Sequence, residues 1–293
     1  MSETAPNPSN SDPGKTKMNA SHLRLSLIAI ASTFALAACG GGGGGDSSST
    51  GAATPPVTPP AATVNVSGSA PAVSGDPVAG LLIPQDFRPA SPGSWDILSE
   101  NLAVANLTSQ SNGAYTKLAI NNSSANVIQI TSGTVSDVAG DGTYAIGRWT
   151  NGVTTSGSLS ANQGVHYVVA KPLNLTTSGS LATWNCTLAS ATKPTAVSGA
   201  VAPGTLNSVT ANVNVGGLGI NSITFNVSVG SDSSVSITKT NVLPGNFLGD
   251  GSTYAMSSEF VGTDPSNPML AIGYALHLPT TGDVNGVAVL QCH

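Results

Sequence analysis

The stretch SVTANVNVGGLGINSITFNVSVGSDSSVSI, residues 208–237, decides the fold class of this chain. Apolar side chains alternate with serine, threonine and asparagine over residues 209–215 and again over residues 223–229. A period of two places one face of a strand in a core and the other in a polar setting. The segments 216–219 and 230–233 have the glycine and serine content of hairpin turns. The stretch therefore predicts three neighbouring strands in an antiparallel meander.

Further segments with the same period continue the sheet along the chain. With the meander they make nine candidates, the others being residues 144–149, 165–169, 181–188, 252–260, 269–277 and 284–291. A sheet of that size closes on itself or folds into two layers. We therefore predict an all-β fold, with an antiparallel barrel of eight to nine strands over residues 141–293. A looser set of strand candidates over residues 81–140 predicts a small β-rich subdomain before it.

The composition limits the partners of this barrel. Charged residues make up 8% of the chain, against about 25% in ordinary soluble domains. The net charge is -5 and no basic cluster occurs, which argues against a nucleic-acid partner. A barrel that spans the outer membrane also alternates and carries few charges, but it needs girdles of aromatic residues. Aromatic residues make up only 4% of this chain, so a soluble barrel is favoured.

The N-terminal segment carries an export signal. Translation is expected to begin at Met18, and Arg24 then precedes an apolar stretch over residues 25–35 that is too short to span a bilayer. Residues 1–38 are therefore predicted to be a signal peptide. The following Leu-Ala-Ala-Cys, which ends at Cys39, resembles the lipobox of bacterial lipoproteins. This resemblance implies that Cys39 carries a diacylglyceryl group and palmitate, and that the lipid anchors the chain in a membrane.

The residue after the lipidated cysteine indicates the destination. Gly40, in place of aspartate, resembles the pattern of lipoproteins sent to the outer membrane, with the surface and periplasmic faces both left open. Residues 39–80 are rich in Gly, Ser, Thr, Pro and Ala and poor in large apolar side chains. Such a composition cannot offset the entropy of ordering, so this segment is predicted to be a disordered tether.

Two cysteines remain once Cys39 is lipidated. An even pair in an exported protein indicates a disulfide, because the compartment is oxidising. We expect Cys186 and Cys292 to be joined, with two free thiols as the alternative. The bond would tie the end of the chain to the third strand of the barrel, and its role would be structural.

Three short motifs carry a family resemblance. They are GTYAIGRW at residues 142–149, GNFLGDG at residues 245–251 and VNGVAV at residues 284–289. With the lipobox and the tether, they resemble the surface lipoproteins of the transferrin-binding protein B group. The resemblance covers about residues 140–293 and implies a barrel with a binding role. The chain departs from the group by having one barrel instead of two and by lacking large charged loops, so transferrin is not carried over as the ligand.

A second resemblance is to the Gly-x-Trp at the start of lipocalin barrels, which is matched here by Gly147, Arg148 and Trp149. In lipocalins the tryptophan plugs one end of the barrel and a cationic side chain packs on the tryptophan. Ala145, Gly147 and Trp149 share one strand face, so the small residues leave room for a ring. We expect Arg148 and Trp149 to form a packing device at the barrel end, with ligand contact as the alternative.

Enzyme signatures are missing from the sequence. It has no Gly-x-Ser-x-Gly elbow, no His-Glu-x-x-His and no phosphate-binding Gly-Lys-Ser/Thr. His166, His277 and His293 lie on different segments. They could converge on a metal or haem with a nearby tyrosine, Tyr167 or Tyr274, but isolated surface histidines are the favoured interpretation. We therefore expect no catalytic residue, no metal and no cofactor.

Five aspartates lie in segments with the composition of turns, where the side chain of aspartate accepts hydrogen bonds from the nearby backbone. They are Asp137, Asp141, Asp250, Asp264 and Asp283. Residues 137–141 and 264–267 are alternative candidates for calcium loops, but neither segment has the necessary series of ligands.

These observations support three hypotheses about function. The favoured one is an outer-membrane lipoprotein that serves as a non-enzymatic binding or interaction module, with a protein or small ligand at the loops of one barrel end. The second is a lipocalin-like carrier of a small apolar ligand, which requires a cavity of about 300 Å³ or more. The third is a secreted hydrolase whose site has no recognisable motif.

Overall fold

The computed structural model describes residues 63–90, 98–119, 127–176 and 182–293, all within one compact unit, Thr58–His293. The predicted signal peptide, the lipidation site Cys39 and the first part of the predicted tether lie outside these residues. Within the described ranges, no helix has the length and apolar character needed to cross a bilayer.

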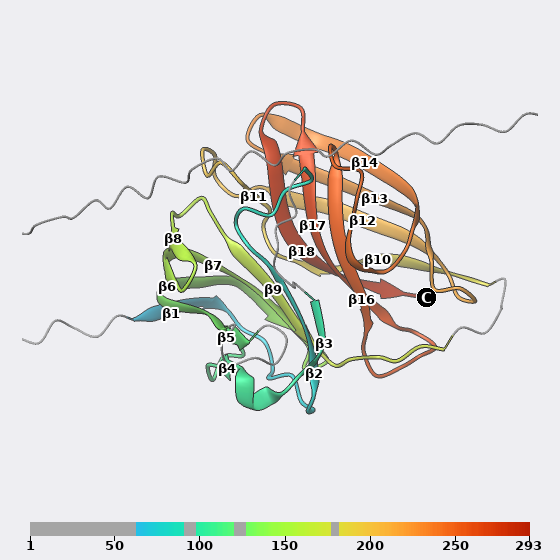
Figure 1. Ribbon diagram of the computed structural model, residues 1–293, viewed down its shortest axis with the longest axis horizontal. Helices are drawn as coiled ribbons and strands as arrows, with labels where there is room; N and C mark the ends of the chain where they lie inside the picture. Colours follow the sequence, from blue (N-terminus) through green and yellow to red (C-terminus); the bar gives the residue numbers. More distant parts are fainter. Residues whose placement is uncertain (1–62, 91–97, 120–126, 177–181) are drawn as a thin grey trace, which may run out of the picture. The chain divides into compact units, whose positions relative to one another are not determined.

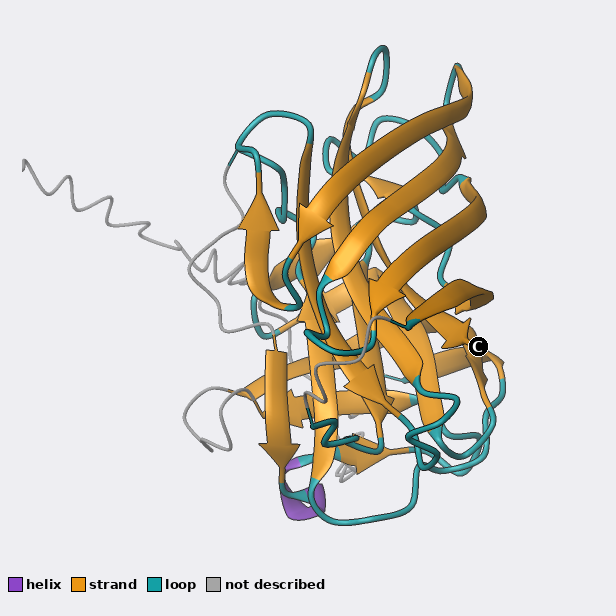
Figure 2. Ribbon diagram, turned by 90° about the vertical axis from the view of Figure 1, so that its right-hand side faces the viewer, coloured by secondary structure: helices purple, strands orange, loops and turns teal. Residues whose placement is uncertain are grey.

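Strands form almost all of the regular structure (Figure 2), which confirms the predicted all-β class. They are arranged in two sheets of nine strands, each curled into a half-barrel, and the described residues include one short 3-10 helix, η1 (Val104–Asn106). Pairing is antiparallel except between β1 and β6, which are parallel.

The first sheet has the strand order β3-β2-β9-β7-β6-β5-β4, with β1 paired to β6 and β8 paired to β7. Its strands are β1 (Val64–Gly68), β2 (Val78–Ile83), β3 (Leu98–Leu102), β4 (Thr108–Ser109), β5 (Tyr115–Ala119), β6 (Val127–Gly140), β7 (Tyr144–Thr154), β8 (Gly157–Leu159) and β9 (Val165–Ala170).

The second sheet has the order β14-β13-β12-β10-β18-β17-β16-β15, with β11 paired to β18 (Figure 1). Its strands are β10 (Thr183–Ala191), β11 (Thr195–Ala196), β12 (Thr205–Asn214), β13 (Ile220–Val229), β14 (Asp232–Val242), β15 (Gly245–Gly249), β16 (Tyr254–Val261), β17 (Met269–Leu278) and β18 (Gly282–Cys292).

The predicted meander is confirmed as β12, β13 and β14. Val209, Val213 and Phe225 are fully buried, whereas the polar residues between them face outward. Gly230 begins the second hairpin with a φ of 59°, a left-handed conformation that glycine adopts without strain. Alternation in the sequence therefore translates directly into an inner and an outer face.

The boundary between the two sheets differs from the one predicted after residue 140. The strands predicted at residues 144–149 and 165–169 were expected in the C-terminal barrel, but they are β7 and β9 of the first sheet, and the second sheet begins at β10. The reason is long-range pairing: β7 lies between β6 and β9, and β9 pairs with β2. The composition along the chain carries no sign of this partition.

The predicted tether also ends earlier than expected. Strand β1 lies within the predicted tether, residues 39–80, and β2 begins within it; β1 pairs with residues of β6. All six residues of β2 are buried. Pairing with distant strands orders segments whose local composition predicts disorder, so the prediction was wrong for β1 and for the first residues of β2.

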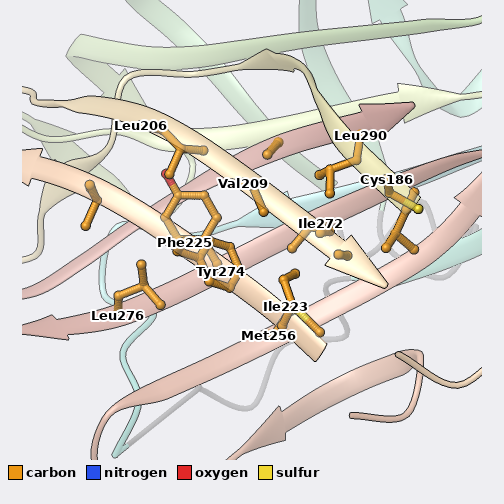
Figure 3. Packing of buried hydrophobic residues seen from close by; sticks show 14 of the residues in the cluster. Cys186, Leu206, Val209, Ile223, Phe225, Met256, Ile272, Tyr274, Leu276 and Leu290 are labelled. Atoms are coloured by element: carbon orange, nitrogen blue, oxygen red, sulfur yellow. The ribbon is translucent and has the colours of Figure 1, made fainter. Parts of the chain in front are cut away.

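Each sheet has its own core, and in each a tyrosine lies over a glycine of the neighbouring strand. Tyr167 pairs with Gly147 in the first sheet, and Tyr274 pairs with Gly286 in the second. A Cβ atom on either glycine would come within 2.5 Å of the tyrosine hydroxyl oxygen. Figure 3 shows Tyr274 beside Phe225. The centroids of the two rings are 5.3 Å apart. Absence of a side chain on one strand thus makes room for a ring on the next.

A third cluster joins the two sheets along a seam. Larger side chains of the first sheet, such as Leu81 and Ile83, face the small residues Ala271, Gly273 and Ala275 of β17. A Cβ on Gly273 would lie 2.3 Å from the Ile83 side chain. The seam is therefore close-packed, and the small residues of β17 are needed for that packing.

The predicted disulfide is present. Cys186 of β10 and Cys292 of β18 face each other in register, with 106 residues of separation and 3.9 Å between their Cα atoms. The bond connects β18 to β10, which is the first strand of the second sheet in chain order, whereas Cys186 was expected in the third strand of a barrel.

Candidate ligand-binding site

A cavity of about 310 Å³ opens beneath the β7–β8 hairpin, and we call it the hairpin cavity. Its lining comes from β2, β6, β7, β8 and β9 and from the segment after β2. The lining residues are Leu82, Pro84, Gln85, Asp86, Ile128, Thr154, Ser156, Gly157, Ser158, Leu159 and Val165. This volume is at the lower end of the range of about 300–1,000 Å³ that small-molecule sites occupy.

The floor of the hairpin cavity is apolar. It consists of Leu82, Ile128, Leu159 and Val165, each no more than 8% exposed. These side chains belong to the core of the first sheet, and the strand period directs them to its inner face. The floor is therefore a part of the core that the β7–β8 hairpin does not cover completely.

Two polar groups of the lining already have partners in the protein. The Gln85 side-chain nitrogen donates to the carbonyl oxygens of Ala196 and Val197, each at 3.0 Å, and its oxygen accepts from the backbone N–H of Gly164. The Thr154 hydroxyl donates to the carbonyl of Gly157 at 2.9 Å. Both side chains hold the backbone around the cavity in place.

The remaining polar groups are at the mouth. Asp86 is exposed and is the one charged residue in the lining, and Ser156 and Ser158 are exposed on the hairpin. Arg88 lies close by, but its Nε donates to the backbone oxygen of Asp86 and it is not part of the lining. The mouth therefore offers one carboxylate and two hydroxyls above an apolar floor.

A buried polar cluster lies at the seam between the sheets and centres on His166. Its Nδ1 is 2.7 Å from the Thr192 hydroxyl, and its Nε2 is 2.9 Å from the Thr195 hydroxyl. The Thr195 hydroxyl also donates to Asn285 Oδ1 at 3.1 Å. Asn285 Nδ2 in turn lies within 3.1 Å of three carbonyl oxygens after β2. Side chains from β9 and the second sheet are thereby linked to the chain after β2.

The charge state of His166 follows from this setting. Complete burial and, secondly, the positive charge of Arg148 lower its pKa well below the usual value of 6.5. The ring is therefore neutral at physiological pH, with both nitrogens engaged by threonine hydroxyls. It is a structural connector and has no free position for a ligand or proton transfer.

Arg148 and Trp149 are adjacent on β7, and their side chains go to opposite faces. Trp149 is buried in the core of the first sheet, where its Nε1 donates to the carbonyl of Tyr115 at 2.8 Å. Arg148 instead donates from Nε to Asp137 at 2.8 Å. The arginine thus does not pack on its neighbouring tryptophan as the lipocalin resemblance implies, and neither residue lines the hairpin cavity.

The other candidate residues from the sequence do not come together. His277 binds Asp283 at 2.7 Å at a hairpin, and the backbone of His293 pairs with Asn185. Burial raises the pKa of the Tyr167 and Tyr274 hydroxyls. Within the described ranges, no group of three or more His, Cys, Asp or Glu side chains could hold a metal ion.

Three aspartates accept hydrogen bonds from the local backbone, as predicted: Asp141, Asp250 and Asp264. Asp137 differs, because it lies in a bulge of β6 with a φ of 58° and binds Arg148 and the backbone N–H of Lys193. The expectation that Asp137 serves a turn was therefore wrong.

The outer face of β10, β12, β13 and β14 is an ordered array of neutral polar side chains. One row across the four strands contains only threonines, and the next contains asparagine, serine and threonine. Asn212 donates to Asn185 at 2.9 Å, and the Thr224 and Thr238 hydroxyls are also 2.9 Å apart. A partner on this face would meet hydrogen-bonding groups and no charge.

Sequence reasoning missed the hairpin cavity and the cluster around His166. Gln85, Thr192, Thr195 and Asn285 had no distinguishing signal, because serine, threonine and asparagine are abundant throughout the chain. Their roles depend on partners up to 201 residues away. A pattern of spacing within one segment could not have identified them.

No protein-family model matches the chain, and no curated protein matches it. A solved structure to which it is similar is a mutant of the vaccine antigen transferrin-binding protein B from Haemophilus parasuis Hp5, with 9% sequence identity and a TM-score of 0.33. The similarity covers 74% of this chain and 45% of that one, so the chain spans less than half of that protein's length.

Proposed function

We propose that this chain is an outer-membrane lipoprotein that acts as a non-enzymatic binding module. The Leu-Ala-Ala-Cys ending at Cys39, the Gly40 that follows it and the all-β body support this proposal. The lipid would provide the membrane anchor and the sheets would present the binding surface. Its partner is a protein or a small molecule, with no role for nucleic acid or a cofactor.

The proposal of a non-enzymatic role rests on the environment of His166, whose ring is bound by other side chains of the protein. Both of its ring nitrogens are within 2.9 Å of threonine hydroxyls, and the ring is completely buried. A general base must instead reach the substrate proton that it removes. The lining of the hairpin cavity contains one carboxylate and no histidine, so the hydrolase hypothesis gains no support there.

Lipid labelling tests the anchor. Cells that express the wild type or Cys39→Ala are grown with a radiolabelled fatty acid, and label is expected in the wild type alone. Unlabelled wild-type protein would remove the anchor from the proposal.

Protease treatment of intact cells tests the membrane face. Degradation is expected if the binding module faces outward, with a periplasmic protein as the control for cell integrity. Protection in cells that degrade fully after lysis would place the module on the periplasmic side.

A second candidate function is supported by the hairpin cavity. Its volume of about 310 Å³ meets the size that a carrier of a small apolar ligand requires. The protein exported by its native host can be extracted with organic solvent and the extract analysed by mass spectrometry. A stoichiometric small molecule that is missing from a cavity-filling Ser158→Tyr variant would support the carrier function.

A further inference from the structure

We infer that the hairpin cavity binds a small apolar molecule that carries an amine or another cationic group. This inference rests on the proposed carrier function and specifies its ligand. It depends on three features of the lining: an apolar floor, polar groups that are already satisfied, and one carboxylate at the mouth.

The apolar floor determines the body of the ligand. Leu82, Ile128, Leu159 and Val165 present hydrocarbon to a space that is open on one side. Removing apolar surface from water is favourable, so a ring or short chain gains free energy on this floor. A compact molecule fits the volume of about 310 Å³, whereas the long chain of a membrane lipid exceeds it.

The satisfied polar groups limit what the ligand can bind deeper in the cavity. Gln85 uses its amide nitrogen and oxygen for three backbone groups, and the Thr154 hydroxyl bonds to Gly157 and the N–H of Ser156. A ligand group could bind them only by displacing these bonds, which leaves buried groups unpaired. The polar part of the ligand is therefore expected at the mouth.

The carboxylate determines the charge of that polar part. Asp86 is exposed at the mouth, and the lining contains no positive side chain. A cationic group placed there is attracted, and an anionic group is repelled. The exposed Ser156 and Ser158 hydroxyls can accept further hydrogen bonds from an ammonium. A primary amine on an apolar body thus complements all three parts of the site.

A pair of matched probes tests this charge preference. The probes are 1-naphthylmethylamine and 1-naphthoate, which share one ring system and carry opposite charges at neutral pH. Their dissociation constants are measured by calorimetry with the mature chain, residues 39–293, carrying Cys39→Ala, so that neither the signal peptide nor a lipid requires detergent. We expect the amine to bind about fivefold more tightly than the carboxylate, as an attraction and a repulsion at a solvent-exposed carboxylate would give.

Two variants assign the preference to this cavity. Asp86→Asn should reduce the preference to less than about twofold while naphthyl binding persists, since only the charge is removed. Ser158→Tyr should weaken both probes by about tenfold or more, because the ring occupies the mouth of a cavity at the lower size limit. The matched controls Asp283→Asn and Ser233→Tyr change residues outside the lining and should leave both affinities unchanged.

The outcomes separate this inference from the proposed function. Equal binding of the two probes, or tighter binding of the carboxylate, overturns the cationic ligand and leaves a carrier of another apolar class. A preference that survives Asp86→Asn also overturns the inference. Binding of neither probe by a chain with an unchanged melting temperature overturns both the inference and the carrier function, whereas the lipid anchor is decided independently by labelling.

Discussion

Two glycines allow tyrosine rings to lie across a neighbouring strand, one in each sheet. The Tyr167 ring occupies the space over Gly147, and its hydroxyl accepts a hydrogen bond from the backbone N–H of Tyr115 at 3.0 Å. Tyr274 and Gly286 repeat the arrangement in the other sheet. At the residue scale, the lack of a side chain at each glycine is thus as necessary for packing as the tyrosine ring.

Gly147→Ala is expected to destabilise the protein by about 1–3 kcal/mol, because the new methyl group overpacks the core. Its Cβ would lie 2.3 Å from the Tyr167 hydroxyl oxygen and 2.4 Å from its ring carbon Cζ. Gly219→Ala is the control, since a Cβ there meets nothing within 4 Å. Urea unfolding of the two variants measures the difference, and equal stability would show that the tyrosine ring can move away at little cost.

His166 is expected to make the fold sensitive to acid. Its folded pKa is lowered by burial and by Arg148, so below pH 6.5 the unfolded state binds the proton first. The stabilising contribution is complete above pH 6.5 and is lost as the pH falls from there towards the folded pKa. Between pH 7.5 and pH 5 the free energy of unfolding is expected to fall, with a contribution from His166 of at most about 2 kcal/mol.

Urea unfolding at the two pH values measures this loss in the wild type, His166→Gln and the control His277→Gln. The loss should shrink in the first variant and persist in the second. NMR titration of the His166 ring in the wild type provides a check that does not depend on the variant's folding. A ring that titrates normally near pH 6.5 would contradict the expectation.

Strands β10 and β18 are joined both by pairing and by the disulfide. The covalent bond adds to hydrogen bonds that continue on both sides of it, because β10 also pairs with β12. At the element scale, the C-terminal strand is therefore held in the middle of the second sheet and does not form an edge.

The double variant Cys186→Ala/Cys292→Ala is expected to lose about 2–5 kcal/mol of stability, because the 106-residue loop between the cysteines is no longer closed in the unfolded state. Thermal unfolding under non-reducing conditions measures the loss. Mass spectrometry after alkylation of the wild type isolated from its native host is the accompanying test. Two alkylated thiols there would refute the bond.

The two sheets of the compact unit contact each other through the apolar seam and through polar contacts that include Asn285. Asn285 is fully buried, and its Nδ2 lies 3.1, 3.0 and 3.1 Å from the carbonyl oxygens of Pro84, Gln85 and Phe87. At the scale of the whole molecule, this side chain connects β18 to the segment that leads away from β2. The same segment lines the hairpin cavity.

Asn285→Ala is expected to destabilise the protein by about 1–3 kcal/mol, since buried carbonyl groups lose their donor. Hydrogen exchange should show faster opening of the β2 and β9 amides at the seam than in the wild type. The exposed Asn207 also donates to other side chains, so Asn207→Ala is the control and should change stability by less than about 0.5 kcal/mol. Equal effects of the two variants would argue against a linking role for Asn285.

Much of the fold was open to prediction because strand formation leaves a local signature. Alternation over residues 208–237 identified β12, β13 and β14, and the count of cysteines after Cys39 identified the disulfide. The assignment of strands to one sheet or the other could not be predicted from such local patterns. Strands β2 and β9 pair although they are far apart in the chain. Nothing in the sequence of either strand indicates which strand it pairs with.

The sequence by itself determined the all-β class, the inner and outer face of each strand in the meander, and the pairing of Cys186 with Cys292. These follow from a period of two and from the two cysteines that remain after Cys39, both of which are local or compositional properties. Only the tertiary structure decided that Arg148 and Trp149 serve different faces, that His166 is enclosed by threonines, and that a cavity opens under the β7–β8 hairpin. Each of these three features depends on contacts between side chains that are far apart in the sequence. Serine and threonine are so frequent in this chain that the sequence does not distinguish the hydroxyl groups that form these contacts from the others.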